Sequence, residues 1–157
     1  MKAQCAFSEL SLLNVQKSYP LSPPLDIFDK WTPPGPGFVK ANMDTSVDLD
    51  GRKASAAIIF RDEDGRFLGG TSASFIQSSI AFVEAYAVRL DTCVTIDVGF
   101  SKVIVESDNA DVIFHIISKT LLVWVSPTIE GDILGISAPF PCFYFSAIKR
   151  ACNKVTD

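Results

Sequence analysis

Hydrophobic and polar positions alternate along three stretches of the chain, and this period of two predicts three β-strands. The stretches cover residues 38–44, 53–60 and 66–75. Between the second and the third lies the sequence Asp62-Glu63-Asp64-Gly65, and Asp-Gly is typical of the tight turn that closes a β-hairpin. We therefore expect the three strands to pair antiparallel.

The hydrophobic period then changes to that of a helix over residues 80–98. One face of this helix is predicted from residues spaced by three and four, namely Val83, Ala87, Leu90 and Val94. Gly99 is the expected end, because glycine readily adopts the left-handed conformation that closes a helix. Residues 102–106 are rich in β-branched side chains and predict a short buried strand of the parallel kind.

A second helix is predicted for residues 109–118, with Asp108 or Asn109 as its N-cap. Its inward face is expected to consist of Val112, Ile113, Ile116 and Ile117. Residues 128–134 fit a short helix, and residues 140–148 fit a final strand. The resulting order, βββαβαβ, predicts an α/β fold with a mixed five-stranded sheet and helices on its faces, because a strand-helix-strand crossover requires parallel neighbours.

Prolines indicate where this domain begins. The run Trp-Thr-Pro-Pro-Gly-Pro-Gly at residues 31–37 lacks the backbone donors that a helix or a central strand needs, so we place the boundary there. Residues 1–30 contain Pro20, Pro23 and Pro24 and show no sustained period, which predicts an irregular leader. A length of 157 residues, 48% of them hydrophobic and 20% charged, suits one packed domain over residues 31–157.

The composition argues against membrane and secreted classes of protein. No stretch approaches the ~20 apolar residues that cross a bilayer, and no continuous apolar run follows Lys2 as in a secretion signal. We therefore expect an intracellular protein of the nucleus or cytoplasm with no membrane partner. Its four cysteines, which lack a C-x-x-C pair, indicate buried, reduced thiols rather than zinc ligands or disulfides: Cys5, Cys93, Cys142 and Cys152.

The formal net charge is -4, from 14 basic and 18 acidic residues. This balance argues against a protein that coats nucleic acid through its bulk surface. It is compatible with an enzyme that clusters carboxylates around divalent cations, because bound metal reverses the local field.

Four acidic residues lie where strand and helix ends are expected to meet. Asp44 ends the first strand, Glu84 lies early in the first helix, Asp108 follows the fourth strand and Asp157 is the last residue. Singly, each has a structural explanation as a cap, a turn residue or a favourable charge near a helix N-terminus. As a set they would converge, since strands one and four are expected to be neighbours, and converging carboxylates repel one another unless cations bind.

Five motifs follow one another in order between Trp31 and Asp157. They are W-T-P-P-G-P-G-F-V-K-A-N-M-D, F-R-D-E-D-G-R-F-L-G-G, V-E-A-Y-A-V-R-L, G-F-S-K-V-I-V-E-S-D-N-A and R-A-C-N-K-V-T-D. Together they resemble the type 1 ribonuclease H domains of plant retroelement-derived, reverse-transcriptase-associated proteins. The resemblance implies an endonuclease that hydrolyses the RNA strand of an RNA/DNA hybrid, leaving a 5′-phosphate and a 3′-hydroxyl, with two Mg²⁺ ions or with Mn²⁺ as an alternative.

By this resemblance, Asp44 would bridge both ions, Asp157 would share the ion that activates water, and Glu84 with Asp108 would hold the second. Asn153 would be a supporting residue near the substrate. Hard oxygen ligands suit Mg²⁺, and two ions ~3.5–4 Å apart can activate a water and stabilise the leaving oxygen. The expected partner of a monomer is an RNA/DNA hybrid or another nucleic acid, recognised by backbone shape and 2′-hydroxyl contacts.

Three features depart from the family pattern. Thr45 replaces the glycine that usually follows the first Asp, Ala147 replaces a histidine, and the chain ends at Asp157, so the final helix is expected to be missing. Two hypotheses remain open: an active hybrid-specific ribonuclease, and a catalytically weak or inactive remnant that binds nucleic acid or protein. A third, the exonucleases that share this fold, requires a carboxylate where this chain has Ser46.

Overall fold

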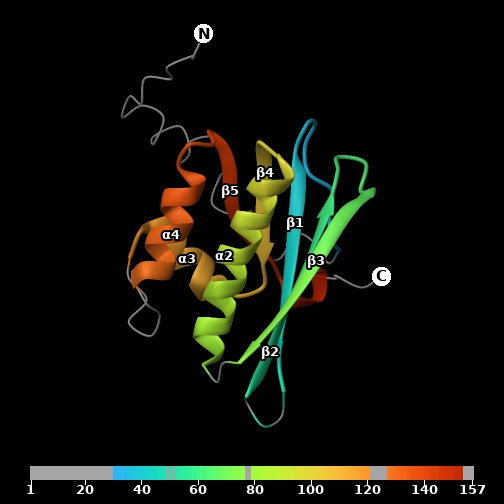
Figure 1. Ribbon diagram of the computed structural model, residues 1–157. Coiled ribbons are helices and arrows are strands. Elements are labelled where there is room, and N and C mark those ends of the chain that lie inside the picture. The colour runs from blue at the N-terminus through green and yellow to red at the C-terminus, as the bar shows by residue number, and fades with distance from the viewer. Residues whose placement is uncertain (1–29, 49, 51, 77–78, 121–126, 154–157) are drawn as a thin grey trace.

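The computed structural model describes residues 30–48, 50, 52–76, 79–120 and 127–153. The chain forms one five-stranded sheet, and Figure 1 shows the helices packed beside it. The elements follow the chain in the order β1 (Val39–Val47), β2 (Lys53–Arg61), β3 (Phe67–Ile76), α2 (Ile80–Val98), β4 (Lys102–Ser107), α3 (Ala110–Ser118), α4 (Pro127–Ser137), β5 (Cys142–Ala147) and a 3-10 helix (Arg150–Cys152).

The sheet is mixed and has the strand order β3-β2-β1-β4-β5. The pairs β1–β2 and β2–β3 are antiparallel, and the pairs β1–β4 and β4–β5 are parallel. The predicted α/β class with a mixed five-stranded sheet is confirmed, as are the antiparallel unit and the buried parallel strand. Since β1 is paired on both sides, it occupies the centre of the sheet.

Helix α2 begins and ends where the sequence predicts. The Ser79 hydroxyl accepts a hydrogen bond from the Phe82 N–H at 3.4 Å, which satisfies one of the first backbone donors of the helix. Gly99 closes the helix with φ 92°, a left-handed conformation that a side chain would disfavour. Val83 and Ala87 are buried on the predicted face. This helix packs on β1, β2 and β4 and against α4.

The connection from β4 to β5 contains two helices, which correspond to the helix predicted over residues 109–118 and the short helix predicted over residues 128–134. Asn109 is the N-cap of α3, because its Oδ1 accepts from the Val112 N–H at 3.1 Å. The expectation that Ile117 faces inward is wrong: it is 41% exposed, since it lies at the flank of the last helical turn. Helix α4 is longer than predicted: it continues to the buried Ser137, whose hydroxyl donates to the Ile133 carbonyl at 2.7 Å.

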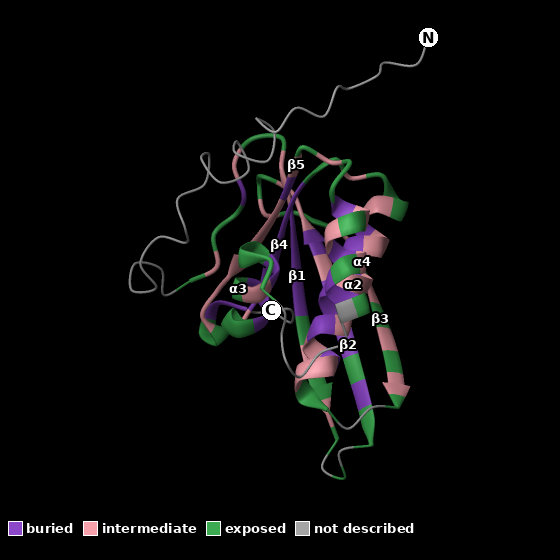
Figure 2. Cartoon of the chain, turned by 90° about the vertical axis from the view of Figure 1, so that its left-hand side faces the viewer, coloured by how far each residue is buried: buried purple, intermediate pink, exposed green. Residues whose placement is uncertain are grey.

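Buried positions gather in the central strands β1 and β4 and on one side of the neighbouring helices, as Figure 2 shows. In β2, buried and more exposed residues alternate, whereas β4 is buried from Val103 to Ser107. This difference follows from position: β4 lies between two parallel neighbours, while β2 turns one face outward. The edge strand β3 has no fully buried residue.

The proline-rich residues 31–37 pack onto the start of the sheet. The Lys40 ammonium donates to the Thr32 carbonyl at 2.6 Å and lies 5.4 Å from the centre of the Trp31 ring. The Arg61 guanidinium lies 4.5 Å from the same ring. Cation–π contacts of this kind stabilise a local arrangement modestly. The segment therefore packs with the domain that follows it, and the boundary at residue 31 stays a prediction.

No helix in the described part of the chain is long and apolar enough to span a membrane. None of the described cysteines forms a disulfide. Cys152 is buried as predicted, but Cys93 and Cys142 are only half-buried, because they lie on partly covered faces of α2 and β5. Cys5 lies outside the described residues.

Candidate functional site

Asp44 and Asp108 lie at matching points of two neighbouring strands. Asn42 of β1 is paired with Glu106 of β4 in a parallel register, so Asp44 and Asp108 each follow that pair by two residues. Carboxyl ends of parallel strands meet at one edge of a sheet, which brings the two acids to the same region. Asp44 is exposed and Asp108 half-buried, so both are accessible from solvent.

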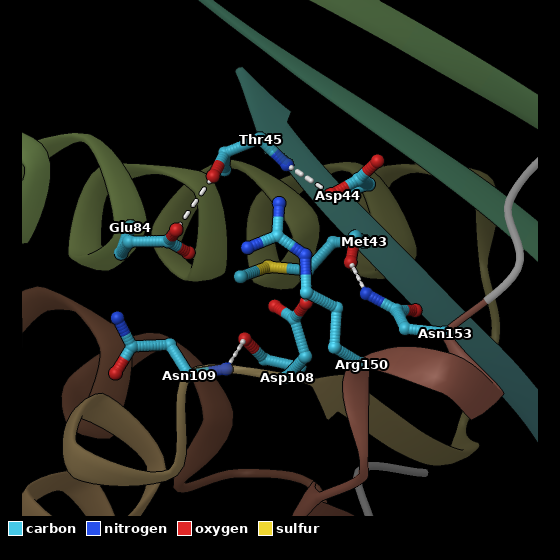
Figure 3. A network of polar contacts seen from close by, with 9 residues as sticks. Met43, Asp44, Thr45, Glu84, Asp108, Asn109, Arg150 and Asn153 are labelled. Carbon is cyan, nitrogen blue, oxygen red and sulfur yellow. Dashed lines mark hydrogen bonds and ion pairs between the residues drawn. The ribbon is translucent and has the colours of Figure 1, made fainter. Parts of the chain in front are cut away.

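Glu84 reaches this region from helix α2. The Thr45 hydroxyl, on β1, donates a hydrogen bond to Glu84 Oε1 at 2.6 Å. The Thr45 backbone N–H donates to Asp44 Oδ1 at 2.9 Å. Figure 3 shows Thr45 between the two carboxylates, bonded to each through a different atom. Thr45 thus connects the strand acid to the helix acid.

The pKa of Glu84 depends on its burial and on the charges of its neighbours. Burial raises the pKa of the Glu84 carboxyl above its usual value, and the hydrogen bond from Thr45 opposes this rise. The charges of Asp108 and then Asp44 raise the pKa further, while Arg150 lowers it. The Glu84 carboxyl therefore responds both to burial and to the like charges of the two aspartates.

Arg150 supplies positive charge to the same region. Its Nε lies 3.8 Å from Asp108 Oδ2, and its side chain is largely exposed. Figure 3 shows the Arg150 side chain reaching from the 3-10 helix toward the carboxylates. A cation in this position offsets part of the repulsion among the acids.

The donor chemistry fits a divalent metal ion. Asp44, Glu84 and Asp108 present hard carboxylate oxygens, and a bound cation would relieve the repulsion that adds to the effect of burial on the pKa of Glu84. However, the three side chains do not surround a common point. Among the described residues, no group of three or more His, Cys, Asp or Glu side chains is placed to hold a metal ion.

Asn153, the last described residue, lies beside the site. Its side-chain amide donates to the Met43 carbonyl at 2.6 Å, next to Asp44 in β1, and Asn153 is buried. The 3-10 helix before it positions both Arg150 and Asn153 beside β1. Asp157, the fourth predicted ligand, lies outside the described residues. A substrate contact by Asn153 and a metal contact by Asp157 stay predictions.

A buried ion pair beneath the site was not predicted from the sequence. Lys40 Nζ lies 2.7 Å from Glu106 Oε1, and Asn42 Nδ2 donates to Glu106 Oε2 at 2.8 Å. All three side chains are buried. Two signals were available: Lys40 and Asn42 alternate with core residues in one strand, and Glu106 ends an apolar strand, where a charge requires a partner.

The strand order, the parallel β1–β4 pair and the acids at its end define a ribonuclease H-like domain. The family described as Reverse transcriptase-like matches residues 42–157. The chain belongs to this family. The predicted plant and retroelement origin stays a prediction.

Several solved structures share the fold. The N-terminal RNase H domain of a Mycobacterium tuberculosis protein is 14% identical with a TM-score of 0.64, over 74% of this chain and 85% of that one. RNase H1 of Halobacterium salinarum is 14% identical with a TM-score of 0.62, over 73% and 87%. A compost metagenome RNase H1, determined in complex with an RNA/DNA hybrid, is 19% identical with a TM-score of 0.61, over 73% and 88%. A comparison with curated proteins finds no match.

Proposed function

We propose that this domain is a ribonuclease that binds an RNA/DNA hybrid and hydrolyses its RNA strand. The observation that carries the proposal is the gathering of Asp44, Glu84 and Asp108 at the carboxyl ends of the paired strands β1 and β4. Burial and the neighbouring carboxylates raise the pKa of Glu84 there. Membership of the Reverse transcriptase-like family and the ribonuclease H-like fold support it. A structural relative was determined with an RNA/DNA hybrid, and we extend that ligand class to this chain.

The proposed cofactor is Mg²⁺, with Mn²⁺ as an alternative. Asp44, Glu84 and Asp108 would hold it, and Asp157 is the proposed fourth ligand. When bound, such ions lower the pKa of a coordinated water and stabilise charge on the phosphate. The exposed Arg150 guanidinium would contact a phosphate oxygen of the substrate, and backbone contacts of this kind position a nucleic acid without reading its sequence.

The second candidate is a module that binds the hybrid without cutting it. Two contacts favour it, since both engage carboxylates that a metal ion would need: the hydrogen bond from Thr45 to Glu84 and the approach of Arg150 to Asp108. Ala147 lies at the end of β5, where the family pattern has a histidine for proton transfer. Losing general acid–base assistance lowers a rate by roughly 10²–10⁴-fold, so slow cleavage is expected even from an active domain.

The deciding experiment follows strand-labelled duplexes incubated with the full chain in the presence of Mg²⁺, Mn²⁺ or EDTA. We expect slow cleavage of the RNA strand in the hybrid, with double-stranded DNA left intact. Asp44→Asn should abolish cleavage, because it removes a charge while preserving the shape of the side chain. Circular dichroism and thermal melting of this variant serve as the folding control.

The two candidates predict different patterns. Metal-dependent cleavage that Asp44→Asn abolishes supports the ribonuclease. Hybrid binding without cleavage at any protein concentration, unchanged by EDTA and by Asp108→Asn, refutes it and supports the binding module.

A further inference from the structure

The hydrogen bond from Thr45 to Glu84 is the most direct contact within the carboxylate cluster. It is 2.6 Å long and partly buried, and it joins β1 to α2. Thr45 is paired with Ala56 of β2, so its backbone is held by the sheet. Hydrogen bonds to a carboxylate are short and about twice as strong as bonds between neutral groups. The contact therefore restrains the Glu84 side chain.

This restraint bears on how the carboxylates are arranged. Glu84 Oε1 is engaged by Thr45, and no three described ligands are placed around one point. The Glu84 carboxylate has the right chemistry for a hard cation and lies within electrostatic reach of Asp44 and Asp108. Glu84 reaches the cluster from a helix through a long side chain, so gathering the three acids around an ion would turn this side chain and would break or bend its bond to Thr45.

We propose that Thr45 is a positioning residue whose hydroxyl holds Glu84 out of the metal-binding arrangement, so that the site binds Mg²⁺ more weakly than the same site without this hydroxyl. The proposal rests on the proposed function in taking Asp44, Glu84 and Asp108 as the metal site. By this proposal, the threonine that replaces the family's glycine at position 45 controls the affinity of the site for metal. A hydrogen bond to a charged group shifts an equilibrium by about tenfold or more.

The test measures Mg²⁺ and Mn²⁺ binding to the full chain by titration calorimetry, without nucleic acid. Thr45→Val removes the hydroxyl with little change of shape and suits a β-strand. Thr45→Ser retains the hydroxyl and is the matched rescue variant. Thr45→Ala provides a second hydroxyl-free variant if the valine packs poorly. We expect Thr45→Val and Thr45→Ala to bind Mg²⁺ about tenfold more tightly than the wild type, and Thr45→Ser to remain near it.

Each other result overturns the proposal. Weaker Mg²⁺ binding by both hydroxyl-free variants means that Thr45 supports a metal ligand instead of restraining it. Equal Mg²⁺ affinities of the variants and the wild type mean that the bond does not oppose metal binding. If no variant binds Mg²⁺ measurably, the three carboxylates do not form a metal site. Hybrid cleavage is measured separately: tighter metal binding without cleavage contradicts only the proposed function, and cleavage with unchanged affinity contradicts only the role of Thr45.

Discussion

Asp91 lies on the buried side of α2 and offers a quantitative test of the packing. The side chain is fully buried, and its Oδ1 accepts a hydrogen bond from the Thr95 hydroxyl at 3.0 Å. Its Oδ2 has no hydrogen-bond partner among the described residues. Burial raises the pKa of this carboxyl from an ordinary 3.8 to about 7, although the bond from Thr95 acts in the opposite direction.

The sign of the effect on stability follows from proton binding. Between the ordinary pKa of 3.8 and the folded-state pKa of about 7, the folded chain holds a proton that the unfolded chain has released. The free energy of unfolding therefore falls as pH rises through this window and levels off above it. The full difference corresponds to roughly 4 kcal/mol, and the part between about pH 5.5 and pH 8 to roughly 2 kcal/mol.

Asp91→Asn isolates this contribution, because the amide has nearly the same shape and does not ionise. We expect the stability of the variant relative to wild type to increase by roughly 2 kcal/mol from about pH 5.5 to pH 8. Urea denaturation followed by circular dichroism at several pH values measures the difference. Asp97→Asn is the matched control, since Asp97 is exposed in the same helix and should leave the pH dependence of wild type intact. A constant difference between Asp91→Asn and wild type across this range refutes the reasoning.

Two further predictions concern the supports of the site. Asn153→Ala should lower the free energy of unfolding by about 1–3 kcal/mol in urea titrations, because the buried bond to the Met43 carbonyl is lost; an unchanged midpoint contradicts this role. Lys40→Met should lower it by about 3–5 kcal/mol, because Glu106 is left buried without its cation. The double variant Lys40→Met/Glu106→Gln should lose less than Lys40→Met alone, and an equal or larger loss argues against the buried pair as the cause.

The elements that the sequence predicts best combine a clear period with a clear end. Residues 80–98 have both, and α2 begins and ends there. The sequence predicts helix α4 too short, because Gly135 weakens the helical pattern where the predicted helix ends, whereas the last turn is stabilised by the buried Ser137, whose hydroxyl donates to the Ile133 carbonyl. Burial against distant segments is a tertiary effect, which a local pattern reflects only in part.

The same distinction applies to the site. The positions of Asp44 and Asp108 at neighbouring strand ends follow from strand order, which the sequence predicts. The hydrogen-bond partner of Glu84 does not follow from strand order, because its bond with Thr45 depends on the rotation of α2 and on one side-chain rotamer. Arg150 begins the motif R-A-C-N-K-V-T-D, but its approach to Asp108 depends on a short 3-10 helix that has no periodic signal in the sequence.

The three described carboxylates are fixed by the fold to different degrees, and this decides where the site is adjustable. Asp44 belongs to a strand paired on both sides, and Asn153 binds the adjoining Met43 carbonyl. Asp108 directly follows β4 and precedes the cap of α3. Glu84 alone reaches the cluster from a separate helix through a long side chain, so its rotamer can change while the sheet stays fixed. A single hydroxyl on β1 therefore suffices to set the arrangement, without any change in the fold that holds the other two acids.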